Sequence, residues 1–307
     1  MAVRVRCFAK LNLFLKIYGK RADGFHDLVS LMQSIDLADK LLLEETGDEG
    51  IVISCTNPNI PADSRNLVWR AAEMLAEAAG RPVGGLRITI EKNIPIMGGL
   101  GGGSSDGAGA LAGLRKLWKL DIEDKQLFEV AARLGSDVPF CLLGGTALVS
   151  GRGEYLEPMP TGIAETPRSF GAFLLIIPPL HVSTKAAYEL LDEVRERAVS
   201  KWDEPREEYT TAREGWMAAI ATGNVPLLFH NDFEQPLFYA MPELEAIHTN
   251  LRNFAGHALL SGSGSCVFAW YPMVLDAMTA VDRYPALAGE TPLVVFPAGI
   301  GIQVESD

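Results

Sequence analysis

A glycine-rich loop at residues 98–105 has a composition that suits the binding of a phosphate chain. Five of the six residues from 98 to 103 are glycine, which costs conformational entropy and adds almost no packing. Such a run is typical of a backbone that closely approaches a ligand. Because a helix is predicted directly after it, the loop would bring unpaired N–H groups and the positive end of a helix dipole to one spot. A polyphosphate is the ligand that this environment favours.

Two common nucleotide-binding motifs do not fit this loop. Gly98 and Gly103 have the separation of a Walker A motif, but Ser104 stands where that motif requires lysine. No GxGxxG frame fits either, which disfavours a Rossmann dinucleotide site. Taken alone, the segment could also be a flexible surface turn.

The composition of the chain excludes several classes of protein. A formal net charge of −12 argues against a nucleic-acid partner, since binding to a phosphate backbone relies on Lys and Arg. One loop with inward-facing N–H groups can still bind an anion on an acidic protein. The 307 residues are enough for one large domain or two ordinary ones, with a core that needs neither metals nor disulfides.

A cytoplasmic protein is expected from the cysteines and from the apolar segments. The four cysteines form no CxxC pair and no zinc spacing, so they are expected to be reduced. Arg4, Arg6 and Lys10 interrupt the first residues, which disfavours a secretory leader. The longest apolar run, residues 173–180, is too short to span a membrane.

Strands and helices are expected to position the loop in the first half of the chain. Alternating and β-branched residues indicate strands, and an apolar stripe with helical spacing indicates helices. The expected strands are residues 3–8, 11–18, 28–35, 40–45, 86–91, 146–149 and 154–156. The expected helices are residues 66–79, 104–118 and 123–134.

Prolines and a glycine between residues 158 and 167 predict a boundary between two domains, 1–160 and 161–307. The second half should open with a strand at 172–177 and return with strand, glycine turn and strand at 258–271. The expected helices are residues 184–199, 212–221, 225–237 and 243–254, with a charged surface loop at 203–208. Strands and helices are more segregated than alternating, which favours an α+β fold with mixed or antiparallel sheets.

Four blocks of sequence, in order, resemble the GHMP kinases, and among them the 4-diphosphocytidyl-2-C-methyl-D-erythritol kinases. Residues 9–15 (Ala-Lys-Leu-Asn-Leu-Phe-Leu) and 19–28 (Gly-Lys-Arg-Ala-Asp-Gly-Phe-His-Asp-Leu) resemble the N-terminal signature of those kinases. Pro95 and residues 99–105 resemble their ATP loop. Residues 135–140 (Gly-Ser-Asp-Val-Pro-Phe) resemble their catalytic segment, and residues 261–268 resemble their C-terminal glycine motif.

The resemblance implies a two-domain GHMP kinase fold with the active site in the interdomain cleft. It implies that ATP phosphorylates the 2-hydroxyl of 4-diphosphocytidyl-2-C-methyl-D-erythritol, a step of non-mevalonate (MEP) isoprenoid biosynthesis. The partner is then a small cytidine diphosphate alcohol. Mg²⁺ would arrive with ATP, since no protein-only metal site is expected from the spacing of the histidines.

The resemblance also implies that Lys10 and Asp137 are catalytic. Asp137 would accept the proton of the substrate hydroxyl. Lys10 would favour the ionised form of Asp137 and stabilise the charge that develops on the hydroxyl or the γ-phosphoryl group. From the residues alone, Asp137 could be a helix cap and Lys10 a solvated lysine on a strand. Asn12 shares the strand face of Lys10 and is expected to orient the same groups at the substrate.

The resemblance places ATP on the loop and the residue before it. The expected contacts are Pro95, Gly98, Gly99, Leu100, Gly101, Gly102, Gly103, Ser104 and Ser105. The two serines could instead cap the following helix. Asp106 departs from the family, where asparagine commonly follows the serines. A carboxylate near phosphates is repulsive unless a cation intervenes, so Asp106, like Ser104, is a candidate magnesium ligand or else faces away.

By the same resemblance, Phe25 and His26 form the cytosine pocket, with the ring stacking on the base and the histidine binding its edge. The related kinases usually carry tyrosine before the histidine, so Phe25 keeps the stacking face and lacks the hydroxyl. Tyr188 is a candidate for the other wall. The alternative for Phe25 and His26 is a packed aromatic ring beside a surface histidine. The alternative for Tyr188 is a helix residue that faces the core. Gly262 and Gly264 form either a simple hairpin or a turn against the phosphate loop.

Two other functions stay open at the level of sequence. A GHMP kinase acting on homoserine or a mevalonate-type alcohol would have the same loop, but it would not need the base-recognition segment at residues 19–28. A non-catalytic ligand-binding protein on this fold could lose Lys10 or Asp137, and both are present. No oligomeric state is predicted.

Overall fold

The structure, a computed structural model, describes residues 2–160, 171–197 and 205–305. Strands form two sheets in these ranges, one of eight strands and one of four. The larger sheet contains β1 (Ala2–Lys20), β2 (His26–Thr46), β3 (Ile51–Cys55), β4 (Gly85–Glu91), β5 (Thr146–Gly151), β6 (Tyr155–Pro158), β8 (His230–Asn231) and β12 (Ile302–Val304). The smaller sheet contains β7 (Ala172–Ile177), β9 (Leu259–Leu260), β10 (Val267–Tyr271) and β11 (Thr291–Val295).

Both sheets agree with the predicted α+β fold. The larger sheet is mixed, since β3 pairs in parallel with β4 and β8 in parallel with β1, whereas its other pairs are antiparallel. The smaller sheet has the order β11-β7-β10-β9 and is antiparallel throughout its described strands.

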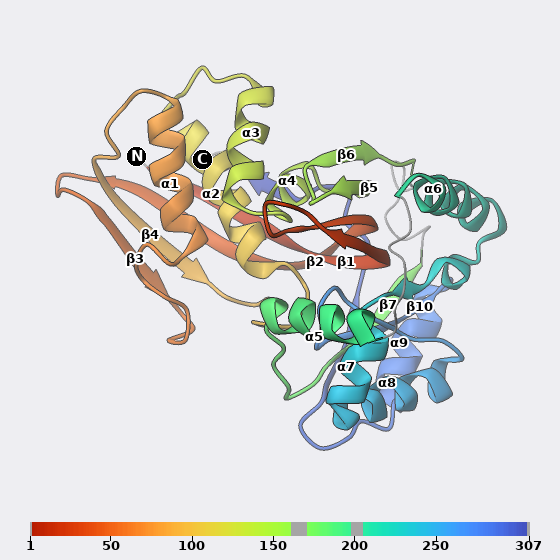
Figure 1. The fold of residues 1–307 in the computed structure, drawn as a ribbon. Helices are drawn as coiled ribbons and strands as arrows, with labels where there is room; N and C mark the ends of the chain where they lie inside the picture. Colours follow the sequence, from red (N-terminus) through yellow and green to blue (C-terminus); the bar gives the residue numbers. More distant parts are fainter. Residues whose placement is uncertain (1, 161–170, 198–204, 306–307) are drawn as a thin grey trace.

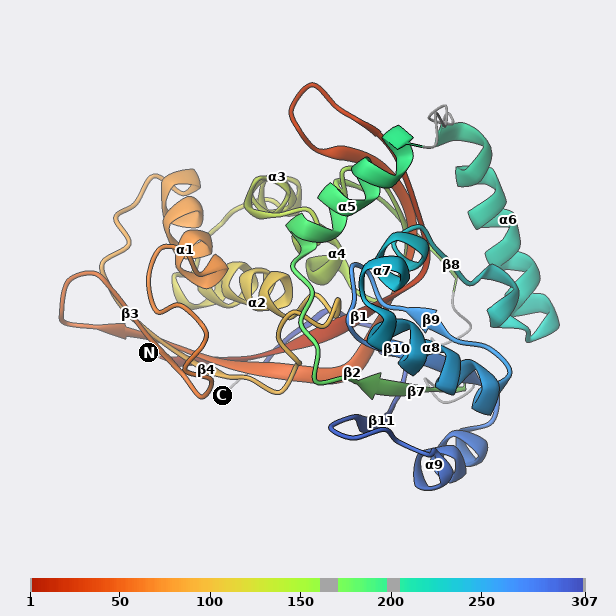
Figure 2. The same ribbon diagram turned by 60° about the horizontal axis from the view of Figure 1, so that its bottom comes forward.

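Helices pack on the sheets in two groups (Figure 1). The first group packs on the larger sheet and consists of α1 (Leu67–Ala78), α2 (Gly102–Leu117), α3 (Asp124–Leu134) and α4 (Val138–Leu143). The second group consists of α5 (Thr184–Arg197), α6 (Pro205–Thr222), α7 (Glu234–Ala240), α8 (Pro242–Ala255) and α9 (Val274–Arg283). Helix α2 contacts β1 and β2 directly, and α1 contacts both α2 and α3. Helices α8 and α9 pack on the smaller sheet (Figure 2).

Strands β1 and β2 are each longer than predicted. The sequence predicted four short strands in this region, and the structure has two continuous strands that pair antiparallel. The pairing shifts register between Phe8 and Lys10, between Asn12 and Phe14, and again near the hairpin. Each shift absorbs a residue as a β-bulge does, so the strand continues where the alternation of apolar residues is broken.

The first two register shifts determine which way the residues between them face. Cys7 before the shifts and Leu15 after them belong to one core cluster, with α2. Leu11 and Leu13, between the shifts, belong to a second cluster, with Trp216 of α6. Each bulge moves the alternation by one residue and thus to the other face. Lys10 therefore faces the same side as Cys7 and Leu15, although unbroken alternation would have put it on the opposite side.

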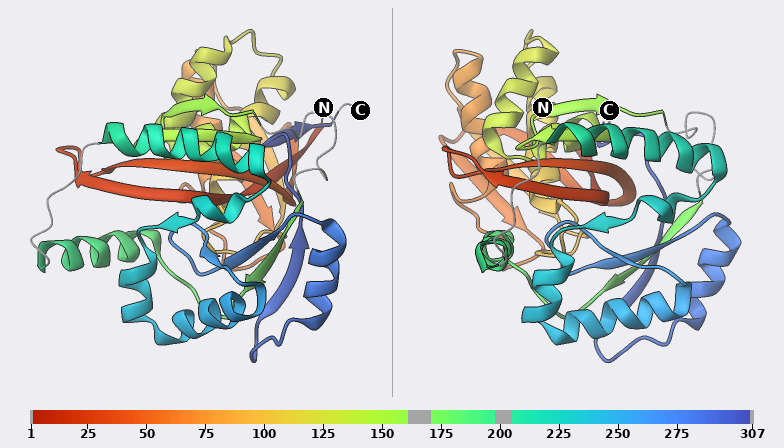
Figure 3. Two further views of the ribbon diagram at one scale, coloured as in Figure 1. Left: turned by 90° about the vertical axis from the view of Figure 1, so that its right-hand side faces the viewer. Right: turned by 45° about the vertical axis from the view of Figure 1, so that its right-hand side comes forward.

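Segments of the second half also complete the larger sheet. Strand β12 pairs with the beginning of β1, and β8 pairs with its middle. Helix α6 runs alongside the long β1 and β2 strands (Figure 3) and contacts β2. The predicted boundary at residues 160/161 falls next to residues 161–170, which lie outside the described residues, so the two-domain division stays a prediction.

Two predicted elements of the second half are wrong. Residues 205–208 of the predicted surface loop belong to α6, because proline fits the first turn of a helix and Arg and Glu are good helix formers. The predicted helix at 225–237 is broken into a short 3₁₀ helix (Val225–Leu228), β8 and α7. Here tertiary contacts override propensity, because Asn231 donates to the carbonyl oxygens of Leu260 and Gly262, each at 2.8 Å. No helix in the described ranges is long and apolar enough to cross a membrane.

Candidate active site

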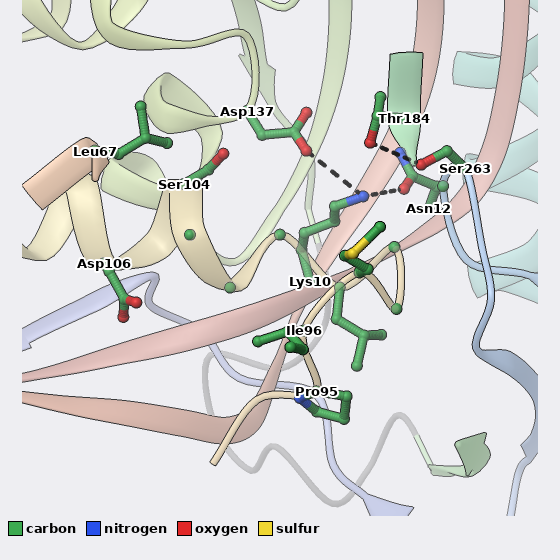
Figure 4. A pocket seen from close by; sticks show the side chains of 18 of the residues that line it. Lys10, Asn12, Leu67, Pro95, Ile96, Ser104, Asp106, Asp137, Thr184 and Ser263 are labelled. Atoms are coloured by element: carbon green, nitrogen blue, oxygen red, sulfur yellow. Dashed lines mark hydrogen bonds and ion pairs between the residues drawn. The ribbon is translucent and has the colours of Figure 1, made fainter. Parts of the chain in front are cut away.

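A cavity of about 450 Å³ lies between the first and second halves of the chain (Figure 4). Strand β1, the glycine-rich loop and the start of α4 line it on one side, and α5 with the 261–265 turn lines it on the other. The predicted site residues on its wall are Lys10, Asn12, Pro95, Gly98, Gly99, Leu100, Gly101, Gly102, Gly103, Ser104, Asp106, Asp137 and Tyr188. Three other predicted site residues, Phe25, His26 and Ser105, are not part of its described lining.

Two positions of the glycine-rich loop cannot readily carry a side chain. Gly99 has a φ of +73° and Gly101 a φ of +71°, in the left-handed region that glycine alone adopts without strain. A Cβ on Gly99 would lie 1.9 Å from the carbonyl oxygen of Ser261. A Cβ on Gly101 would lie 3.0 Å from Cγ of Lys10. The glycines therefore let the loop pack between β1 and a second glycine turn, residues 261–265.

Hydrogen bonds hold the loop on both sides. The N–H of Lys10 donates to the carbonyl of Leu100 at 3.0 Å, and the N–H of Cys266 donates to that of Gly98 at 3.1 Å. The second glycine turn lies against the same place, because a Cβ on Gly262 would be 2.9 Å from Nζ of Lys10. The turn thus packs against the loop and is more than an isolated hairpin.

Helix α2 begins inside the loop, two residues earlier than predicted. Gly101 is the N-cap residue, so Ser104 and Ser105 lie in the first turn and do not cap the helix. The N–H groups of residues 102–104 have no carbonyl one turn before them within the helix, and these residues line the cavity. The Ser105 hydroxyl points into the core and donates to the carbonyl of Phe8 at 2.7 Å. Only Ser104 of the two serines therefore has its side chain at the cavity.

Lys10, Asn12 and Asp137 meet at the cavity (Figure 4). Nζ of Lys10 lies 3.7 Å from a carboxylate oxygen of Asp137 and donates to Oδ1 of Asn12 at 2.5 Å. The amide of Asn12 in turn donates to the hydroxyl of Ser30 on β2 at 2.8 Å, which fixes its orientation. Asp137 precedes α4, but its side chain caps none of the described N–H groups of that helix. The geometry thus favours the functional interpretation of Asp137 over the helix cap.

Asp106 faces a lysine that the sequence did not single out. Nζ of Lys92 lies 2.8 Å from Oδ2 of Asp106 and also contacts the carboxylate of Asp39, and all three side chains are almost fully buried. Asp39 further accepts the N–H groups of Asn93 at 2.6 Å and Ile94 at 2.8 Å. Lys92 is therefore a cation that both buried carboxylates, Asp39 and Asp106, contact.

Burial controls the protonation of this cluster. Burial raises the pKa of Asp106 to about 8, and Lys92 only partly opposes that rise. The two carboxylates together raise the pKa of Lys92 in spite of its own burial. The other carboxylate oxygen of Asp106, Oδ1, is buried and has no hydrogen-bond partner among the described residues. The beginning of α2 thus carries a carboxyl group that tends to keep its proton.

The predicted base pocket is only partly assembled at the cavity. Tyr188 lines the cavity, and burial together with the charges of Asp137 and Asp192 raises its pKa. His26 is buried behind Tyr188, with the two rings stacked at 4.9 Å and 24°. Phe25 is 48% exposed and lies under the guanidinium of Arg152, 5.0 Å from it. Among the three predicted pocket residues, Tyr188 is thus the one in contact with the cavity.

Sequence reasoning missed Asp39, Lys92 and Asp192. Asp39 and Lys92 are 53 residues apart and meet because β2 pairs with β4. Asp192 lies 166 residues after its partner His26. No local pattern distinguishes these residues from ordinary surface charges, so the pairing of the strands and the position of α5 supply the information that the sequence lacks.

Comparison with known proteins identifies the family. Residues 66–145 match the family described as GHMP kinases N terminal domain, and residues 216–280 match GHMP kinases C terminal. A 4-diphosphocytidyl-2-C-methyl-D-erythritol kinase of Gloeobacter violaceus is 39% identical over 297 residues, covering 96% of this chain and 93% of that protein. One of Caldicellulosiruptor bescii is 33% identical over 305 residues, covering 97% and 100%.

Solved structures agree with these sequence matches. A crystal structure of a 4-(cytidine 5'-diphospho)-2C-methyl-D-erythritol kinase has a TM-score of 0.73 at 33% identity, covering 96% of this chain and 100% of that one. A homoserine kinase from Cytophaga hutchinsonii has a TM-score of 0.74 at 18% identity, covering 99% and 97%, which speaks for the fold alone. By its full-length identity to named relatives and by its GHMP fold, the chain belongs to the 4-diphosphocytidyl-2-C-methyl-D-erythritol kinase family of GHMP kinases.

Proposed function

We propose that this kinase transfers the γ-phosphoryl group of ATP to the 2-hydroxyl of 4-diphosphocytidyl-2-C-methyl-D-erythritol, in the MEP route of isoprenoid biosynthesis. The observation that carries the proposal is the pair Lys10–Asp137, 3.7 Å apart beside the N-terminus of α2, in a chain 39% identical to kinases with that name. An ammonium, a carboxylate and a helix N-terminus at one cavity are the groups that phosphoryl transfer to an alcohol needs.

The chemistry follows from the positions of these groups. The N–H groups of residues 102–104 and the helix dipole bind the phosphates of ATP. The hydroxyl oxygen of the substrate bonds to the γ-phosphorus of ATP, and the bond from that phosphorus to the β-phosphate oxygen breaks. Asp137 accepts the proton that the hydroxyl loses. Lys10 stabilises the negative charge that develops on the transferred group, and Asn12 holds its ammonium in place.

Magnesium belongs to the proposal as the ion that accompanies ATP. Oxygen donors suit this ion, and two of them line the cavity near the start of α2, the Ser104 hydroxyl and the Asp106 carboxylate. Oδ1 of Asp106 has no hydrogen-bond partner among the described residues, so a cation at this position would take the place of the proton that burial favours. When bound, the ion neutralises phosphate charge.

We assign the binding of the substrate's cytosine to Phe25, His26 and Tyr188. We assign the reaction to the cytoplasm, on the pattern of cysteines in the chain.

The proposal is tested by turnover of defined alcohols. Purified protein with ATP and Mg²⁺ should release ADP only when 4-diphosphocytidyl-2-C-methyl-D-erythritol is added, and the product mass should rise by one phosphoryl group. Homoserine and mevalonate serve as alternative acceptors, and CMP or CDP should compete with the substrate. Phosphorylation of homoserine or mevalonate without competition by CMP would assign the protein to another GHMP activity. Binding of ATP without transfer to any of these alcohols would identify a non-catalytic protein.

A further inference from the structure

Asp192 on α5 holds two residues of the β1–β2 hairpin at once. Its Oδ1 lies 2.7 Å from Nε2 of His26, the first residue of β2. Its Oδ2 lies 3.3 Å from Nζ of Lys20, the last residue of β1. The Asp192 side chain is 19% exposed and that of His26 is 5% exposed, whereas that of Lys20 is 57% exposed. The contact with His26 is therefore the buried one of the two.

His26 is connected to the cavity through an array of aromatic rings. Its imidazole stacks on Tyr188, one helical turn before Asp192, at 4.9 Å and 24°. Tyr188 in turn meets Phe233 edge to face at 4.9 Å and 89°. Tyr188 and Phe233 both line the cavity, on the side where the second half of the chain faces Asp137. The orientation of the cavity wall therefore depends on where the His26 ring is held.

The hydrogen bond also fixes the chemistry of the imidazole. A carboxylate accepts hydrogen bonds, so Nε2 of His26 is the ring nitrogen that carries the hydrogen. A carboxylate that holds one ring nitrogen sets both the tautomer and the orientation of a histidine.

We propose that Asp192 is a positioning residue for the nucleobase end of the substrate site: it fixes the His26 ring, and His26 braces Tyr188 against the cavity. The proposal rests on the proposed function in one respect, that the ligand at this end is a cytidine nucleotide. Asp192 is not part of the described lining of the cavity, which includes Asp137 and the phosphate loop. Its removal is therefore expected to weaken binding of the cytidine part and to leave the ATP site and the chemical step unchanged.

Helix α5 has a second attachment that does not involve Asp192. The guanidinium of Arg195 donates to the carbonyl of Ile17 at 2.8 Å and to a carboxylate oxygen of Asp232 at 2.7 Å. Asp232 also accepts the N–H of Ile17 at 2.7 Å. Because these bonds tie α5 to β1 independently, substitution of Asp192 should leave the helix in place.

The test measures cytidine binding in three matched variants. Asp192→Ala should raise the Kd for CDP, measured by calorimetry, about tenfold, the size expected for loss of a charge-assisted hydrogen bond. The KM for the cytidine substrate should rise with it, while the KM for ATP and kcat stay within about twofold, as expected when only binding is lost. Asp192→Asn keeps an acceptor oxygen and should fall between Asp192→Ala and the wild type. Glu189→Gln removes an exposed carboxylate of the same helix, which pairs with Lys185 at 3.7 Å, and should leave the Kd for CDP unchanged.

A double-mutant cycle shows whether Asp192 acts through His26. In the His26→Ala background, Asp192→Ala should add nothing further to the Kd, because the two changes remove the same interaction. The ¹⁵N shift of Nε2 of His26 reports its tautomer and should move in Asp192→Ala even without substrate. Wild-type turnover with an unchanged Kd and an unmoved shift in that variant would overturn the role of Asp192 alone. Absence of both turnover and CDP binding in the wild type would overturn the proposed function and this role together.

Discussion

The ammonium of Lys10 lies 3.7 Å from the carboxylate of Asp137, although the two residues are 127 positions apart in the chain. The Lys10 side chain is 5% exposed and that of Asp137 is 32% exposed, so the lysine is buried behind a carboxylate that faces the cavity. Oδ1 of Asn12 accepts a hydrogen bond from the same ammonium. This arrangement leaves the carboxylate accessible to a substrate hydroxyl while its cation is held from behind.

Asp137→Asn should therefore remove the proton acceptor without disturbing the fold. The amide is nearly isosteric with the carboxylate but cannot accept the hydroxyl proton, so kcat should fall by about 10²–10⁴-fold. The KM for ATP should change little, because the phosphates contact the loop. Asp121→Asn, at an exposed position before α3, is the matched control and should keep full activity. Steady-state kinetics and a thermal melt are sufficient, and a kcat for Asp137→Asn within twofold of the wild type would exclude Asp137 as the base.

Local patterns were enough to predict the elements around the phosphate loop. The helix α1 begins after Asn66, whose side chain accepts the N–H of Val68 at 3.0 Å, and the polar residue before an apolar stripe is the signal for that start. The end of α3 at Leu134 agrees with the predicted helix 123–134, and the residue that follows it is Gly135, a common signal for a helix end. In both cases the signal lies within a few residues of the boundary.

The facing of the Lys10 and Asn12 side chains could not be predicted in this way. Lys10 and Asn12 point to the cavity only because two register shifts in the β1–β2 pairing bracket them. A β-bulge depends on the partner strand, so the alternation of β1 by itself places these side chains on the wrong face. The partner of Asp106 was missed for the same reason, since Lys92 reaches it from the end of β4.

Two glycines of the loop should respond to alanine in opposite ways. Gly99 has a positive φ and its added Cβ would lie 1.9 Å from the carbonyl oxygen of Ser261, so Gly99→Ala should destabilise the fold by more than about 1 kcal/mol. Gly103 is helical and has no described atom within 4 Å of an added Cβ. Gly103→Ala should therefore leave the protein as stable as the wild type or slightly more stable.

Nucleotide binding separates the two variants further. If the phosphates occupy the open space at residues 102–104, the new methyl group of Gly103→Ala meets them and weakens ATP binding in a stable protein. Urea unfolding gives the stability of each variant, and calorimetry with an ATP analogue gives its affinity. Unchanged ATP affinity in Gly103→Ala would move the phosphates away from this turn of α2.

Asp106 should make the stability of the protein depend on pH. Its pKa is raised by burial from 3.8 to about 8 in the folded state, so the folded protein holds a proton that the unfolded chain releases in this range. The resulting stability is fully present below pH 3.8 and is lost as the pH rises through about 8. Asp106→Asn removes this titration. The Tm of the wild type should therefore fall more between pH 5 and pH 8 than the Tm of the variant. The difference should be several degrees, since each kcal/mol of unfolding free energy shifts the Tm by about 2–4 °C.

The control for this measurement is an aspartate whose pKa is shifted the other way. Asp63 is exposed and its hydrogen bonds with Arg65 lower its pKa to about 2, so Asp63→Asn should leave the slope between pH 5 and pH 8 unchanged. Equal slopes for Asp106→Asn and the wild type would mean that Asp106 is ionised throughout this range.

Above pH 8, where Asp106 is ionised, Lys92→Met should destabilise the protein strongly, because it leaves the carboxylates of Asp39 and Asp106 buried without their cation. Breaking a buried ion pair from one side typically costs about 3–5 kcal/mol, and urea unfolding would measure the loss. Asp39 still accepts hydrogen bonds from the N–H groups of Asn93 and Ile94, so the carboxylate of Asp106 loses more of its stabilisation. In the Asp106→Asn background the same lysine substitution should therefore cost less by 1 kcal/mol or more, roughly the coupling expected for residues in one network. Strictly additive losses above pH 8 would show that Lys92 stabilises Asp39 alone.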